Sequence, residues 1–194
     1  MICHQARYNK TEYSEIALKL NEAGYHCIAV DLRSGGELNN VKNKTNEAAV
    51  KAGKPVDYLD AEKDIIAAVD YAYTINEQKI ILWGSSYSST LALFVAINND
   101  KVGAVVSFSP GDYFPELGSL NDKLKDFSKP MFVTSSKEES IELTKMLSKM
   151  KLNETQMQFI PKTEGTHGSR ALWESDPAHE EYWEAILPFL EKLK

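Results

Sequence analysis

The stretch that decides the fold runs from residue 79 to residue 94 and reads KIILWGSSYSSTLALF. Its first part is a short apolar run, which is typical of a strand buried on both faces of a parallel sheet. A Gly-x-Ser-x-Ser turn follows at 84–88, and the residues after the turn are apolar on all sides, as in a buried helix. A strand that turns sharply into a helix exposes the residue at the centre of the turn, which is Ser86.

The turn has two interpretations. In the first, it lifts a nucleophilic serine out of the backbone, which requires small residues two positions before and after that serine. Gly84 and Ser88 occupy these places around Ser86. In the second, the serines only cap the helix that follows, because serine is among the preferred N-cap residues. The rest of the chain decides between these two interpretations.

Short apolar runs alternate with longer segments of helical periodicity along the whole chain. This alternation is typical of a doubly wound, mainly parallel α/β sheet with helices on both faces. The length of 194 residues suits a single domain over 1–194, with no room for a cap domain. We expect six strands, at 1–4, 26–31, 79–83, 102–109, 131–135 and 156–160, and helices at 11–23, 58–74, 86–98, 138–150 and 177–193.

Two polar stretches, 33–57 and 111–129, interrupt this alternation, and each follows the end of an expected strand. In open α/β sheets ligands bind beyond the carboxyl ends of the strands. We therefore expect these stretches to form the walls of a site rather than linkers between domains.

Composition excludes several classes of protein. With 43% hydrophobic residues the chain is not intrinsically disordered, and a net charge of −6 disfavours a nucleic-acid partner. The longest apolar run, 91–97, is far below the roughly 20 residues of a membrane span, so we expect no membrane partner. No signal peptide is visible, which makes the cytoplasm the default location unless an upstream segment is removed. Cys3 and Cys27 lack metal-ligand spacing, so we expect no metal and two buried free thiols, with a disulfide between them as the alternative. No nucleotide-binding motif follows any expected strand, so we expect no cofactor.

A serine needs a base to be reactive at neutral pH, and a histidine base needs an acid to orient it. His167 follows the last expected strand, between Gly165 and Gly168, where a loop can bring it over the turn. The acid is expected after the fifth strand, where Glu138 and Glu139 are both available. Acids at that position also suit a helix N-terminus, and Asp112 after the fourth strand is a further alternative.

Stabilising a negatively charged oxygen requires two backbone N–H groups directed at it. One should come from the residue after the nucleophile, Tyr87, and the other from the loop at 3–6 after the first strand.

With serine, acid and histidine in this order, the chain resembles the α/β-hydrolase superfamily. It is most similar to the dienelactone-hydrolase-like and prolyl-oligopeptidase-like branches, and the resemblance begins at the third of the family's usual eight strands. The motifs that carry it are His4-Gln5-Ala6, the segments 23–25 and 29–36, Trp83-Gly84-x-Ser86-Tyr87, the Pro-led run 130–136, and Gly165-Thr-His167-Gly168.

The resemblance implies roles for single residues. Ala6 N–H takes the oxyanion position beside Tyr87, with Gln5 where the family has glycine. The acid falls three residues after Ser136, on Glu139, which stands where the family usually has aspartate. It implies a serine hydrolase with a Ser86–His167–Glu139 triad acting on an ester or similar acyl bond of a small molecule.

We expect a shallow, open pocket formed by 33–57 and, beside the triad, by Gln5, Tyr113, Phe114 and Trp173. A serine peptidase, a catalytically inactive binding module on the same scaffold, and a phosphate-binding protein are the alternatives. Monomer and homodimer are both compatible with the sequence.

Overall fold

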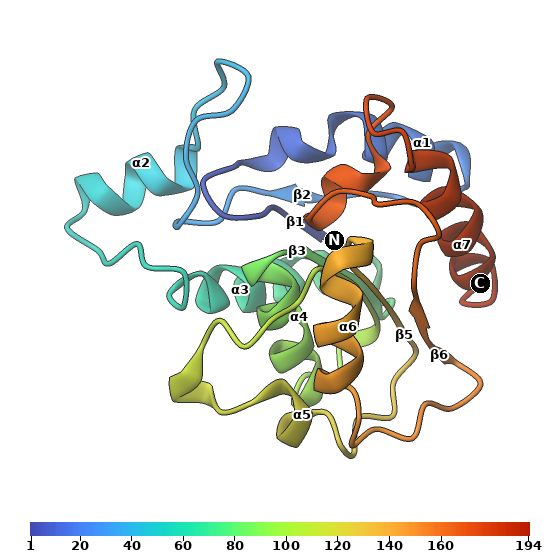
Figure 1. Cartoon of the computed structure of the whole chain (residues 1–194). Helices are drawn as coiled ribbons and strands as arrows, with labels where there is room; N and C mark the ends of the chain where they lie inside the picture. The colour runs from blue at the N-terminus through green and yellow to red at the C-terminus, as the bar shows by residue number, and fades with distance from the viewer.

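In the computed structural model, which describes all 194 residues, six strands form one sheet (Figure 1). The strand order is β2-β1-β3-β4-β5-β6, and every neighbouring pair is parallel. The carboxyl ends of all six strands therefore meet at one edge. The strands are β1 (Ile2–Cys3), β2 (Ala29–Val30), β3 (Ile80–Ser85), β4 (Val102–Phe108), β5 (Met131–Thr134) and β6 (Gln156–Phe159).

Helices cover both faces of the sheet, as the alternating pattern predicts (Figure 1). One face carries helices that connect the strands between residues 29 and 159, and the other carries the first and last helices of the chain. The helices are α1 (Ser14–Glu22), α2 (Lys44–Lys51), α3 (Ala61–Asn76), α4 (Tyr87–Ile97), α5 (Leu120–Lys123), α6 (Lys137–Met146) and α7 (His179–Glu191), with 3-10 turns η1 (Lys10–Tyr13), η2 (Pro115–Leu117) and η3 (Gly168–Leu172).

Successive residues of each strand supply two separate hydrophobic cores, because side chains alternate between the faces of a sheet. Leu82 and Val105 pack with α3, α4 and α6, whereas their neighbours Trp83 and Val106 pack with α1 and α7. The ring of Trp83 stacks on Phe108 of β4 with centroids 5.3 Å apart. Strands buried on both sides explain why these runs are nearly continuous in apolar residues.

Helix α4 is the most deeply buried element of the fold. Every residue from Tyr87 to Ala96 is buried. The all-round apolar pattern of this segment is therefore confirmed as the mark of a helix enclosed by protein. Because α4 follows β3 without a loop, the burial of both elements holds the turn at Ser86 in place.

The outer strand β2 and the segment after it differ from the sequence-based expectation. The expected strand 26–31 pairs only at Ala29–Val30, because its neighbour β1 offers only two residues to pair with. The stretch 33–57, expected to be irregular, contains α2, which projects away from the sheet in Figure 1. No residue of α2 is buried, so this helix has no apolar stripe by which its sequence would reveal it.

None of the helices combines the length and the apolar content that crossing a bilayer requires.

The turn between β3 and α4 depends on close backbone contact. Ser86 has φ 58° and ψ −128°, a conformation that non-glycine residues rarely adopt. Two residues earlier, a Cβ on Gly84 would overlap the carbonyl oxygen of Ser88 and the backbone of Ser89. The first turn of α4 therefore packs directly on the strand, which only glycine permits.

We expect Gly84→Ala to lower the free energy of unfolding by at least about 2 kcal/mol, because the methyl group has to displace backbone. Denaturant titration followed by circular dichroism measures this effect. Gly53→Ala is the matched control, because Gly53 has φ +62° and no atom within 4 Å of an added Cβ. This variant should lose only about 1 kcal/mol of unfolding free energy, which is the cost of a left-handed backbone at alanine. Equal losses in the two variants would contradict the packing argument.

Candidate active site

Ser86 lies at the carboxyl end of β3, held by hydrogen bonds on both sides. Its N–H donates to Phe108 O at 2.8 Å, which ties the turn to β4. Ser88, which stands where the superfamily has glycine, accepts a hydrogen bond from Ser85 N at 2.9 Å and lies 2.9 Å from Cys3 O. The Ser88 hydroxyl thus joins the turn to β1, which gives a structural reason for a serine at this place.

Glu139 and His167 are joined by a hydrogen bond between Glu139 Oε1 and His167 Nδ1. The other carboxylate oxygen, Oε2, accepts from Ser109 Oγ at 2.7 Å and from Ser136 N at 3.2 Å. The bond to Ser136 belongs to a capping box that begins α6. One glutamate therefore caps a helix and bonds a histidine, two functions that the sequence analysis treated as alternatives.

The other two candidate acids lie elsewhere. Glu138 is exposed and makes no hydrogen bond within the chain. Asp112 Oδ1 accepts from Leu120 N at 2.7 Å, and neither of its oxygens reaches His167. Of the three acids that the sequence offers, the structure brings only Glu139 to the histidine.

The environment of Glu139 favours its ionised form. Burial alone would raise the pKa of this carboxyl, but the hydrogen bonds from His167 and Ser109 outweigh burial and lower the pKa to about 2. At neutral pH the group is a carboxylate, which can accept a proton-bearing Nδ1 and leave Nε2 free to take up a proton.

Ser109 is a site residue that the sequence analysis missed. It follows β4 with φ 52°, donates its hydroxyl to Glu139 and accepts from Gly168 N at 3.0 Å. It therefore fixes both the acid and the loop that carries His167. A serine after a strand carries no sequence signal for this function.

His4, Gln5 and Ala6 form the loop after β1. His4 is fully buried, which lowers its pKa to about 4 and keeps the ring neutral. Its Nε2 accepts from Leu32 N at 2.9 Å, so Nδ1 carries the proton and donates to Gln5 O at 2.9 Å. The N–H groups of Ala6 and Tyr87 donate no hydrogen bond within the chain, so both are free to bind another acceptor.

The histidine loop reaches the turn at the residue before Ser86. Ser169 N donates to Ser85 Oγ at 2.8 Å, and Gly168, with φ +74°, lies so close that a Cβ would be 2.6 Å from the same oxygen. No hydrogen bond joins Ser86 to His167 in this structure. Such bonds are often long before substrate binds.

Tyr113 lies beside Ser86. Its hydroxyl donates to Ser109 O at 3.2 Å, and burial raises its pKa while a hydrogen bond with Ser86 opposes that rise. Tyr113 is 43% exposed, whereas Ser86 beside it is buried. From the other side, Ser34 bonds the Tyr87 hydroxyl at 2.7 Å. Both polar stretches thus reach the turn.

The other expected pocket residues take different places. The Gln5 side chain is buried beside Gly168, and its Oε1 has no partner. Trp173 donates its indole N–H to Glu12 O at 2.7 Å. Phe114, expected in an open wall, is 4% exposed and packs in the core with α4, because the chain after Tyr113 turns inward.

Glu12 is the second site residue that the sequence analysis missed. It is fully buried, and its carboxylate accepts from Gln5 N at 2.6 Å and from Ser85 Oγ at 2.7 Å. Burial raises its pKa to about 7, although these hydrogen bonds oppose the rise. A signal was present: Glu12, Ile16 and Leu20 share one face of a helical pattern, and that face is apolar apart from the glutamate.

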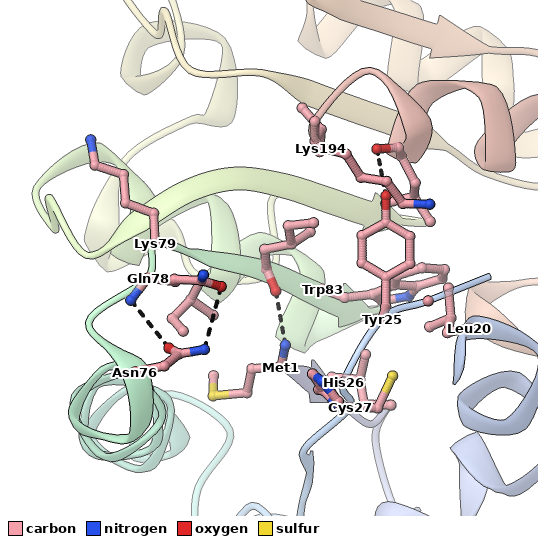
Figure 2. A pocket seen from close by; sticks show the side chains of 16 residues that line it. Met1, Leu20, Tyr25, His26, Cys27, Asn76, Gln78, Lys79, Trp83 and Lys194 are labelled. Carbon is pink, nitrogen blue, oxygen red and sulfur yellow. Dashed lines mark hydrogen bonds between the residues drawn. The ribbon is translucent and has the colours of Figure 1, made fainter. Parts of the chain in front are cut away.

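A cavity of about 570 Å³ lies at the opposite end of the sheet (Figure 2). Met1, Tyr25 and Lys79 line it near the amino ends of β1 and β3, and the Met1 amino group donates to Ile81 O at 2.9 Å. Ser86, Glu139 and His167 take no part in its lining. This cavity and the candidate active site are therefore separate.

The parallel sheet and the serine at its strand–helix turn define a protein of the α/β-hydrolase class. The sequence pattern of the Dienelactone hydrolase family matches residues 1–193, so the chain belongs to that family and is a hydrolase. No curated protein sequence matches it.

Solved structures show the same fold. An esterase from Pyrococcus furiosus superposes with a TM-score of 0.71 at 16% identity, covering 98% of this chain and 80% of that one. A monoacylglycerol lipase from Paleococcus ferrophilus gives 0.60 at 15% identity, with 100% and 93% covered. An acylaminoacyl peptidase from Pyrococcus horikoshii gives 0.61 at 14% identity, covering 98% of this chain but 36% of that one.

The buried Glu12 predicts a pH dependence of stability. Its pKa is about 7 in the folded protein against an ordinary value of 4.5, so the folded state holds more protons between these pH values. Stability contributed by this group is present below about pH 4.5 and is lost as pH rises through about 7, by at most about 1.4 kcal/mol per pH unit.

The test compares the free energy of unfolding of the wild type with that of Glu12→Gln from pH 4.5 to 8. The contributions of the other titrating groups to this free energy are largely shared by the two proteins and cancel in the difference. We expect the wild type to lose stability relative to the variant as pH rises. A difference that stays constant, or that grows in favour of the wild type, would contradict the raised pKa.

Proposed function

We propose that the protein is a serine hydrolase that cleaves an ester, or a similarly activated acyl bond, of a small molecule through an acyl-enzyme. The observation that carries this proposal is the hydrogen bond between Glu139 and His167, formed at the same edge of the sheet as the strained turn at Ser86. A carboxylate that orients an imidazole at the sheet edge that carries a nucleophilic serine is the arrangement that nucleophilic catalysis needs.

The proposal divides the reaction into the following steps. His167 Nε2 takes the proton of Ser86 as Oγ attacks the acyl carbon, and Glu139 stabilises the imidazolium that forms. The free N–H groups of Ala6 and Tyr87 bind the negative oxygen. The imidazolium then protonates the leaving alcohol, and water, activated by the same histidine, releases the acid from Ser86. Protein, substrate and water supply every proton and electron pair in these steps.

An ester is favoured over a peptide as the substrate. The Pyrococcus furiosus esterase is matched over 80% of its length, whereas almost two thirds of the acylaminoacyl peptidase has no counterpart in this chain. Tyr113, which is partly exposed, lies beside Ser86. A small acyl substrate can reach the serine past this residue without a separate domain to select it.

Treatment with a fluorophosphonate probe should add one adduct to the intact protein, because an activated serine displaces the fluoride. Ser86→Ala should abolish the adduct and lower the turnover of a p-nitrophenyl ester about 10⁴-fold or more. The exposed Ser148→Ala is the matched control and should label like the wild type. An unlabelled wild type would favour a catalytically inactive binding module. Labelling that survives in Ser86→Ala would show that Ser86 is not the nucleophile.

Two adjacent glutamates test the identity of the acid. Glu139→Gln should lower kcat/KM for the same ester about 10³-fold or more, because the amide no longer stabilises the imidazolium. Glu138→Gln makes the same chemical change one residue away, at an exposed side chain, and should leave kcat/KM within about twofold. A large loss in Glu138→Gln together with normal activity in Glu139→Gln would identify Glu138 as the acid of the triad.

A further inference from the structure

One buried carboxylate joins the two halves of the candidate oxyanion site. Glu12 Oε2 accepts from the backbone N–H of Gln5, the residue before Ala6, at 2.6 Å. Glu12 Oε1 accepts from the side chain of Ser85, the residue before Ser86, at 2.7 Å. The loop after β1 and the turn after β3 meet at this group and at no residue of the proposed triad.

The loop that carries the histidine is attached to the same carboxylate through Ser85. Ser85 Oγ donates to Glu12 and accepts from Ser169 N at 2.8 Å. Ser169 in turn accepts from the indole of Trp83 at 2.9 Å. Glu12 itself is held by the Trp173 indole, which donates to its backbone oxygen. Three segments far apart in the chain are therefore set relative to one another by one side chain.

Ionisation of Glu12 decides whether this arrangement is satisfied. As a carboxylate it accepts both donors. Once protonated, it carries a hydrogen on Oε1 or Oε2, so either Gln5 N loses its acceptor or Ser85 Oγ has to accept from both Glu12 and Ser169 N. In the second case the Ser85 hydrogen loses Glu12 Oε1 as its acceptor and has to turn to another oxygen of the cluster, such as the unpartnered Gln5 Oε1. An unsatisfied buried donor costs about 1–3 kcal/mol, so the loops have reason to shift.

We propose that Glu12 is a positioning residue whose ionised form holds the oxyanion loop, the nucleophile turn and the histidine loop in their reactive arrangement, and whose protonation releases them. This inference rests on the proposed function. Glu12 itself touches neither substrate nor reacting atoms; it acts through Gln5 and Ser85.

The charges around Glu12 set the pH range of this effect. Burial raises its pKa, and the hydrogen bonds from Ser85 and Gln5, followed by the charges of Arg170 and His167, oppose the rise, which leaves the pKa at about 7. The carboxylate is therefore protonated below about pH 7 and ionised above it. The other titratable groups that face it, from β1, η1 and α4, are neutral at these pH values: Cys3, Tyr13 and Tyr87.

The experiment measures the rate of fluorophosphonate labelling from about pH 5.5 to 9 in the wild type, Glu12→Gln and Glu22→Gln. The charges of Glu12 and His167 interact, so the pH at which the His167 ring titrates is measured by NMR in both proteins, and each rate is divided by the fraction of neutral His167 before the ratio of wild-type to Glu12→Gln is taken. We expect this ratio to be at least about tenfold above pH 8, approaching the 100-fold typical of a lost oxyanion donor, and to fall toward one below pH 6. Glu22→Gln, an exposed control at the end of α1, should follow the wild type.

A ratio that is the same at every pH would assign Glu12 a merely structural role and overturn the proposal, as would equal rates throughout. A wild type that is never labelled would instead overturn the proposed function, and the amide proton of Gln5 then tests Glu12 separately. Its chemical shift should titrate near pH 7 in the wild type and stay constant in Glu12→Gln, together with that of Ala6. Shifts that do not move would overturn the role of Glu12.

Discussion

The rest of the structure depends on the backbone of Ser86, which has to keep φ 58° and ψ −128° between a buried strand and a buried helix. A single non-glycine residue held in this region costs on the order of 1–3 kcal/mol, so its surroundings have to enforce it. Gly84 lets the first turn of α4 lie on β3, and the Ser88 hydroxyl links the turn to β1. Burial of α4 then keeps the strained residue from relaxing into the helix.

The order of the strands turns this local strain into a site. Because all six strands are parallel, the segments after β1, β3, β4 and β5 leave the sheet at one edge. They bring the proposed oxyanion loop, Ser86, the supporting Ser109 and the proposed acid Glu139 to one edge of the sheet. The two carboxylates there differ in pKa for physical reasons. Hydrogen bonds lower the pKa of Glu139 to about 2, whereas complete burial raises the pKa of Glu12 to about 7.

The fold was predictable from sequence because its core strands are buried on both faces and its central helix on all sides, which leaves strong apolar patterns. Ser86 followed from the turn after such a strand, and the resemblance to a family selected Glu139 from two neighbouring acids. Ser109 and Glu12 were not found, because they act through hydrogen bonds to segments distant in the chain, which no local pattern records. Helix α2 was missed because it buries no apolar stripe, and the inward path of Phe114 is set by tertiary packing.

The central claim is that the turn at Ser86 and the loop after β1 together build a site for a tetrahedral oxyanion. The most direct test is a crystal structure of the protein after reaction with a phosphonate ester. We expect phosphorus bonded to Ser86 Oγ, with one phosphonyl oxygen about 2.7–3.1 Å from the N–H groups of both Ala6 and Tyr87. Phosphorus on another residue, or a phosphonyl oxygen directed away from these two amides, would contradict the claim.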